Sequence, residues 1–147
     1  MDERLLPLLL ASDRCAGSNE TEPLDRLRMQ KGVFLLAMRG LPEWRESFKF
    51  TPYDWGPYSF DLASTIESLL ADGLLTKDLV PGRRYSRYRT TQAGERLITE
   101  LATGHLHNER IFICAVREYV TSRSFARLLR EVYKAYPDFA VNSRFAG

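Results

Sequence analysis

The chain has 147 residues, of which 44% are hydrophobic and 27% charged, as is ordinary for one soluble globular domain. Its net charge of +2 is too balanced to indicate a nucleic-acid-binding protein unless the basic residues cluster. The apolar run near the N-terminus is short and broken by Pro7, so we predict no signal peptide and no membrane span, and we expect a cytoplasmic protein.

The first two helices are predicted from leucine-rich periodicity and from residues typical of helix ends. The first covers Glu3–Ala11, with Asp2 as its N-cap. The second begins near Thr21 and Pro23 and runs to Gly40, and its apolar positions predict the most buried helix of the chain.

Next comes a short strand, Phe48–Tyr53, in which aromatic residues alternate with polar ones. A sharp corner at Gly56 and Pro57 follows, and Ser59 then caps a third helix that ends at Gly73.

Two strands, Leu74–Val80 and Arg84–Thr90, flank the turn residues Pro81-Gly82-Arg83 and predict a hairpin. Thr91 is the expected N-cap of a fourth helix, which runs to about Thr103.

Two further helices are predicted over about Glu109–Val120 and over Ser124–Tyr136, where Pro137 ends the last one. The element order predicts a mainly α fold, a winged helix-turn-helix with a short β-hairpin wing and a C-terminal two-helix extension. We expect one winged-helix domain over 1–147, with a core at about 21–104 and the extension at about 105–147.

The two cysteines, Cys15 and Cys114, lie far apart and form no Cys-x-x-Cys motif. In a cytosolic chain we interpret them as reduced thiols, although one disulfide between them stays open.

Several short motifs carry a resemblance to a known family. They are Met29-Gln30-Lys31, Phe50-x-x-Tyr53-x-x-Gly56-Pro57-Tyr58-Ser59, Leu69-x-x-x-Gly73-Leu74, Tyr88-x-Thr90-Thr91-x-x-Gly94 and Val132-Tyr133-Lys134-Ala135-Tyr136-Pro137. The chain resembles YwgA-like winged-helix proteins and the SocA/GepA-like Panacea antitoxin domain. It departs from them at Met29, where Leu is usual, and at Gly32 inside the second helix. The resemblance implies a non-enzymatic bacterial module found with toxins, defence systems and mobile elements, whose partner is nucleic acid or protein.

Basic residues cluster in the predicted wing and make it the first candidate for binding duplex DNA. They are Lys77, Arg83, Arg84, Arg87 and Arg89. Arginines at a hairpin tip can hold phosphates, but they equally suit a solvated strand edge that resists aggregation. Strand alternation predicts Tyr85, Arg87 and Arg89 on one face, and Arg84, Ser86, Tyr88 and Thr90 on the other.

The third helix occupies the position of a recognition helix, yet its expected exposed residues suit base reading poorly. They are Asp61, Ser64, Thr65, Glu67, Ser68 and Asp72, with no Arg, Lys, Asn or Gln among them. Ser59 and Ser64 are the contacts to nucleic acid that we predict from this helix.

The alternative is a protein-interaction module, an antitoxin or adaptor that docks a partner such as a toxin. Its surface would combine the aromatic corner with the acidic helix, namely Tyr53, Trp55, Tyr58, Asp61 and Glu67. The three aromatic residues could also stack on a base, but they suit better a wedge between the strand and the second and third helices. A homodimer stays open.

Two further patterns favour a structural interpretation. Arg123, Arg127, Arg130 and Lys134 form a basic stripe on the last helix, typical of a solvated face. His105-x-His107-x-Glu109 imitates a metal site but lacks the remaining ligands, so we predict no metal. No nucleophile, nucleotide or dinucleotide motif is present, so we predict neither a cofactor nor catalysis.

Overall fold

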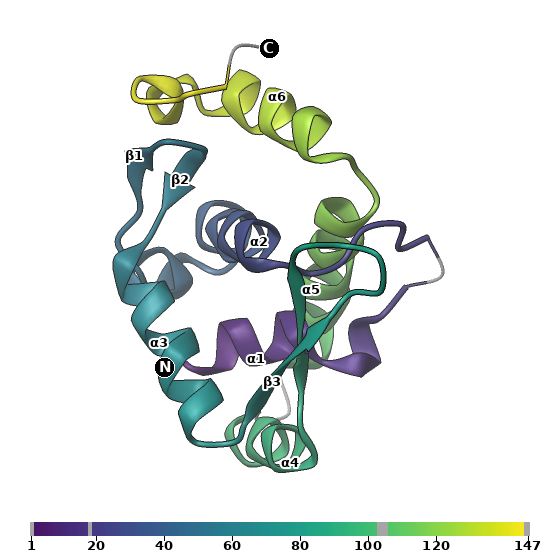
Figure 1. The fold of residues 1–147 in the computed structure, drawn as a ribbon. Coiled ribbons are helices and arrows are strands. Elements are labelled where there is room, and N and C mark those ends of the chain that lie inside the picture. Colours follow the sequence, from purple (N-terminus) through teal and green to yellow (C-terminus); the bar gives the residue numbers. More distant parts are fainter. Residues whose placement is uncertain (1, 18, 103–105, 146–147) are drawn as a thin grey trace.

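The computed structural model describes residues 2–17, 19–102 and 106–145, over which the chain is mainly helical (Figure 1). In chain order the elements are α1 (Leu5–Ala11), α2 (Arg26–Arg39), β1 (Thr51–Tyr53), β2 (Gly56–Tyr58), α3 (Phe60–Ala71), β3 (Leu75–Leu79), β4 (Ser86–Thr90), α4 (Gln92–Leu101), α5 (Leu106–Thr121) and α6 (Phe125–Ala135). Short 3-10 turns cover Asp13–Cys15, Pro42–Glu46 and Pro137–Ala140. Among the described helices, none combines the length and apolar content needed to cross a membrane.

Helix α2 lies at the centre of the molecule, between α1, α5 and the β1–β2 hairpin (Figure 1). Every residue from Arg28 to Ala37 is buried, which confirms the prediction of a buried second helix. Helix α1 is buried along its whole length because its sequence is apolar around the entire circumference. Gly32 permits the close packing of α1 against α2, since a Cβ there would lie 2.5 Å from the Leu10 Cδ2.

The predicted start of α2 at Thr21 and Pro23 is wrong, because the helix begins after Asp25. The Asp25 carboxylate caps it by accepting the Arg28 N–H at 2.9 Å. The preceding segment is held outside the helix, since the N–H groups of Thr21 and Glu22 donate to the Thr121 carbonyl at 3.0 and 2.8 Å. This contact joins residues about 100 positions apart, so no local pattern announces it.

Two buried arginines join the ends of α1, α2 and α5. Arg28 pairs with Asp25 at 2.7 Å and donates to the Val120 carbonyl at 3.0 Å. Arg117 pairs with Glu20 at 2.6 Å and donates to the carbonyls of Leu10 and Ser12. Both side chains therefore serve the fold.

Cys15 and Cys114 form a disulfide, with their Cα atoms 4.7 Å apart. Our interpretation of reduced thiols is therefore wrong for this structure. The bond joins the turn after α1 to α5, across 99 positions of sequence. Helix α5 also supplies Ile113, Val116 and Val120 to the core around α2.

The corner before α3 is a small hairpin instead of one strand followed by a turn. Strand β1 begins only at Thr51, later than predicted, and it pairs with a second strand that the residue pattern did not indicate, β2. Gly56 has a φ of +93°, which glycine adopts readily and other residues rarely do. A Cβ at Gly56 would also lie 3.2 Å from the Tyr133 ring, so this position is closed to larger residues.

The predicted helix caps Ser59 and Thr91 are confirmed, and Ser124 caps α6 in the same way. Ser59, Thr91 and Ser124 each accept a hydrogen bond from the backbone N–H three residues later. The β3–β4 hairpin also agrees with the prediction, and Gly82 has a φ of +74° at its turn.

Candidate nucleic-acid interface

The β3–β4 hairpin is anchored at its base and exposed at its tip. Leu75, Tyr88 and Thr90 are buried against the helical core, and the Tyr88 N–H donates to the Leu24 carbonyl at 2.9 Å. Arg87 and Arg89 are exposed on the opposite face, so the predicted alternation is confirmed over β4. Tyr85 precedes the strand and lines the same pocket as Tyr88 instead of sharing the face of Arg87.

The cross-strand register divides the basic residues of the hairpin between its two faces. Lys77 lies opposite Tyr88, and Asp78 lies opposite Arg87. Residues directly opposite each other in an antiparallel pair project to the same side, so Lys77 shares the face of Tyr88, and Arg87 lies on the other.

Two of the predicted phosphate ligands are engaged within the protein. Arg89 pairs with Asp78 at 2.5 Å. Arg83 lies 3.9 Å from the Glu22 carboxylate and also contacts the Tyr85 hydroxyl and ring. These exposed pairs are weak and an external phosphate can compete for them.

The remaining predicted cations are free to meet a ligand. Over the residues that the structure describes, no ion pair involves Lys77, Arg84 or Arg87, and all three side chains are exposed. They are therefore the strongest members of the predicted set.

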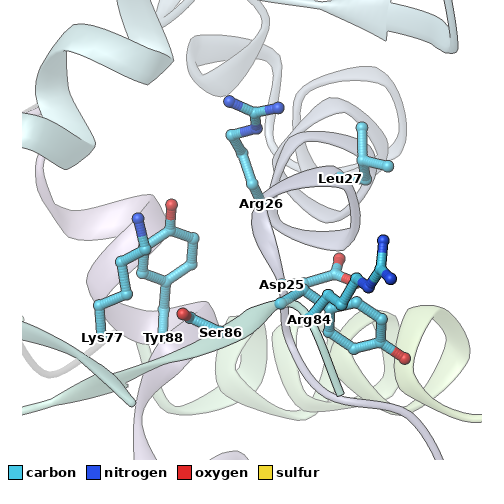
Figure 2. Close-up of a pocket in the computed structure, with 8 residues that line it drawn as sticks. Asp25, Arg26, Leu27, Lys77, Arg84, Ser86 and Tyr88 are labelled. Atoms are coloured by element: carbon cyan, nitrogen blue, oxygen red, sulfur yellow. The ribbon is translucent and has the colours of Figure 1, made fainter. Parts of the chain in front are cut away.

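Arg26, the first residue of α2, extends this cationic surface and is absent from the set predicted from the sequence. It is exposed and lines a pocket of about 290 Å³ together with Lys77 and Arg84 (Figure 2). The complete lining is Asp25, Arg26, Leu27, Lys77, Arg84, Tyr85, Ser86 and Tyr88. In the sequence Arg26 is one more charge on a helix, because the hairpin meets it only in the folded chain.

Tyr88 places a hydroxyl in this pocket. Its side chain is only 4% exposed, yet none of the hydrogen bonds within the described part of the chain uses its hydroxyl group. In Figure 2 the hydroxyl and the Lys77 ammonium point in the same direction. Burial, and then the negative charge of Glu67, raise the pKa of Tyr88, so the hydroxyl keeps its proton and can donate.

A second hollow, of about 360 Å³, lies along the edge of β4 and carries mixed charge. Its arginines include Arg87 and Arg89, but Asp13, Glu20 and Glu22 line it as well. Carboxylates beside a bound phosphate repel it, so this hollow suits anions less well than the pocket of Arg26.

The exposed face of α3 is acidic, largely as predicted. Asp61, Ser64 and Glu67 are exposed, whereas Thr65 is half-buried. Ser59 is fully buried, and its hydroxyl caps α3, so it cannot contact a phosphate. The structure removes Ser59 from the predicted interface and leaves Ser64 accessible.

The Gln30-Lys31 motif holds the backbone of the corner from inside. The Gln30 amide accepts the Ser59 N–H at 2.9 Å and donates to the Ser59 carbonyl at 3.0 Å. The Lys31 ammonium, 1% exposed, donates to the Pro57 carbonyl at 3.3 Å. Burial lowers the pKa of Lys31 to about 7, and the charge of Asp25 opposes this shift. The motif therefore positions β2 and the start of α3 instead of facing a ligand.

An exposed aromatic cluster lies beside the acidic face of α3. The rings of Tyr53, Tyr58 and Phe60 have centroids 5.0 to 5.4 Å apart. Phe60 is 58% exposed, and Tyr53, one of the residues of the predicted wedge between helices, is 43% exposed and does not form it. Trp55 packs on Phe125 of α6, with ring centroids 5.8 Å apart, and is 37% exposed.

The basic stripe of α6 is shorter than the spacing suggested. Arg123 precedes the helix and lies over the Tyr119 ring, and both Arg123 and Arg127 bind Glu131, at 2.9 and 3.0 Å. Arg130 and Lys134 are exposed and supply the remaining charge.

The metal-like pattern cannot be placed. His105 and the side chain of His107 lie outside the described residues, and within those residues no group of three or more His, Cys, Asp or Glu side chains is arranged to hold a metal ion.

No protein-family model matches this sequence, and no curated protein matches it. The functional interpretation therefore rests on the geometry of this chain.

Proposed function

We propose that this chain is a non-enzymatic regulatory module of winged-helix type, which binds nucleic acid, most suitably duplex DNA, through the exposed cations on both faces of the β3–β4 hairpin and at the start of α2. The observation that carries the proposal is a group of exposed cations around the hairpin that form no ion pair with the described residues. They are Arg26, Lys77, Arg84 and Arg87. Such side chains bind phosphates and release counterions.

The order of the elements supports the winged-helix assignment. Helix α2 is followed by the corner, by α3 and then by a hairpin that packs beside α3. In this arrangement the hairpin is the wing. The acidic surface of α3 repels phosphates, so recognition passes to the wing and to the first turn of α2.

The biological setting follows from the resemblance in the motifs. A toxin–antitoxin pair, a defence system or a mobile element is the setting that we propose, with the protein acting in the cytoplasm. The buried Gln30 and Lys31 hold the corner before α3 in place, and this role does not depend on the partner.

A direct test is the mobility of a mixed-sequence duplex in a native gel at low salt. The chain should retard the duplex, and exchange of Arg84 and Arg87 for Gln should weaken binding at least tenfold, because each phosphate contact is lost. Binding that is absent, or unchanged by the double exchange, would refute the proposal.

A second candidate function is supported by the exposed rings of Tyr53 and Phe60. A protein partner, such as a toxin or a second copy of the chain, would cover these rings and meet the carboxylates Asp61 and Glu67. If this is the function, Tyr53→Ala with Phe60→Ala abolishes stoichiometric co-purification of a partner from the native host. The same exchange leaves DNA retention intact.

A further inference from the structure

The pocket between α2 and the hairpin has features beyond those of a general cationic surface. It is concave, with Lys77 and Arg84 of the hairpin at its two sides, Arg26 of α2 between them, and the largely buried Tyr88 in its lining (Figure 2). A duplex backbone passing over a protein needs an open surface, whereas a pocket accepts a group that projects from the end of a molecule.

The charges of the lining match a doubly charged anion. Three cations line the pocket with a single carboxylate, Asp25, and both oxygens of that carboxylate are already bound by Arg28 at 2.9 and 2.7 Å. A phosphate monoester carries nearly two negative charges at neutral pH, whereas an internal phosphodiester carries one. The excess of positive charge therefore fits the monoester better.

The hydroxyl donors give the pocket its selectivity. Tyr88 is more than nine-tenths buried, and its hydroxyl is without a protein partner in the described part of the chain. Ser86 adds a second hydroxyl to the lining. Among the described residues, the buried side-chain atoms without a hydrogen-bond partner are carboxylate oxygens of Glu95 and Glu109, so the Tyr88 hydroxyl reaches solvent in the pocket. It can therefore donate a charge-assisted hydrogen bond to an anionic oxygen there.

We infer that this pocket binds a phosphate monoester through Arg26, Lys77, Arg84 and the Tyr88 hydroxyl. The same chemistry occurs at the 5′ end of a nucleic-acid strand and in a free nucleotide. If the ligand is the 5′ end of a strand, the inference rests on the proposed function and adds to it a preference for phosphorylated ends.

The test compares two labelled oligonucleotides of one sequence, with a 5′-phosphate or a 5′-hydroxyl, by fluorescence anisotropy. The phosphorylated strand should bind about tenfold more tightly, as suits one added group of charge-assisted hydrogen bonds. Adenosine monophosphate and inorganic phosphate serve as unlabelled competitors. If the monophosphate binds by itself but neither oligonucleotide does, the pocket is a nucleotide site, the inference holds and the proposed function fails.

Tyr88→Phe separates recognition from folding. The variant keeps the ring that packs in the core and removes only the unpartnered hydroxyl, so its melting temperature should stay near that of the parent chain. Its preference for the 5′-phosphate should fall severalfold. Arg26→Gln should lower the preference further, whereas the matched exchange Arg130→Gln on α6 should leave it unchanged.

Equal affinity for the two strands, together with no competition by adenosine monophosphate, would overturn the inference. Salt-sensitive binding of both strands in that experiment would leave the proposed function standing. A loss of 5′-phosphate preference that is as large in Arg130→Gln as in Arg26→Gln would also overturn the inference, because net charge alone would then explain the effect.

Discussion

The buried ammonium of Lys31 makes the stability of the fold depend on pH. It lies within α2, is 1% exposed and has one hydrogen-bond acceptor in the described chain, the Pro57 carbonyl at 3.3 Å. Burial lowers its pKa from 10.5 to about 7. Replacing it in Lys31→Met removes the charge and keeps a side chain of similar length.

The sign of the effect follows from proton binding. Between the folded pKa of about 7 and the unfolded value of 10.5, the unfolded chain binds a proton that the folded chain does not. Raising the pH through this window therefore increases the free energy of unfolding of the parent chain. Below pH 7 both states are protonated, and the cost of burying the charge is present in full.

The magnitude is large enough to measure. The parent chain should gain about 3 kcal/mol relative to Lys31→Met between pH 7 and pH 9.5, since each pH unit within the window contributes 2.303RT. Below pH 7 the difference between the two proteins should be constant, with Lys31→Met the more stable because it avoids burying a charge.

The assay is urea denaturation of both proteins at a series of pH values, with the disulfide intact. The difference in free energy of unfolding cancels the groups that titrate equally in both proteins. Two parallel curves from pH 6 to 9.5 would refute the account, because Lys31 would then titrate alike in the folded and unfolded chains.

Three more predictions concern stability and use the same denaturation assay. Gln30→Ala should cost about 2–4 kcal/mol, because it removes two buried hydrogen bonds, and a loss below 1 kcal/mol would contradict the role of this amide. Gly56→Ala should cost more than Gly73→Ala: both have positive φ, but a Cβ meets nothing within 4 Å at Gly73, and equal losses would show that crowding at Gly56 is unimportant. Replacing Cys15 and Cys114 with Ser should cost about 3–5 kcal/mol, and thiol titration of the denatured parent chain should find no free thiol.

Local sequence signals predicted the helices well where the capping group is itself local. Ser59 and Thr91 each cap the helix that follows, as predicted, and the alternation of β4 correctly separated Tyr88 from Arg87. A cap and a two-residue period depend only on near neighbours along the chain, so sequence is sufficient for them.

The predictions that failed all depend on contacts between residues that are distant in sequence. Thr21 is drawn away from α2 by the carbonyl of Thr121, and the disulfide joins cysteines 99 positions apart. Charged residues are ordinarily surface residues, yet Arg28 and Arg117 are buried because backbone carbonyls of other elements satisfy them.

The candidate site was predicted in most of its basic residues but not in its arrangement. Sequence located the basic hairpin, but it could not show that Arg83 and Arg89 are paired internally. Nor could it show that Arg26 completes a pocket with Lys77, because the two are brought together only by packing of the hairpin against α2.

The central claim, nucleic-acid binding by the hairpin, is tested most directly by the salt dependence of affinity for a mixed-sequence duplex. Exchange of Lys77, Arg84 and Arg87 for Gln should make the slope of log K against log salt shallower by about 3, one for each lost phosphate contact. A control with equal charge change is available in three exposed cations on α4 and α6, and it should retain the parent slope. The control residues are Arg96, Arg130 and Lys134. Equal slopes in the two triple variants, or no binding by the parent chain at low salt, would contradict the account.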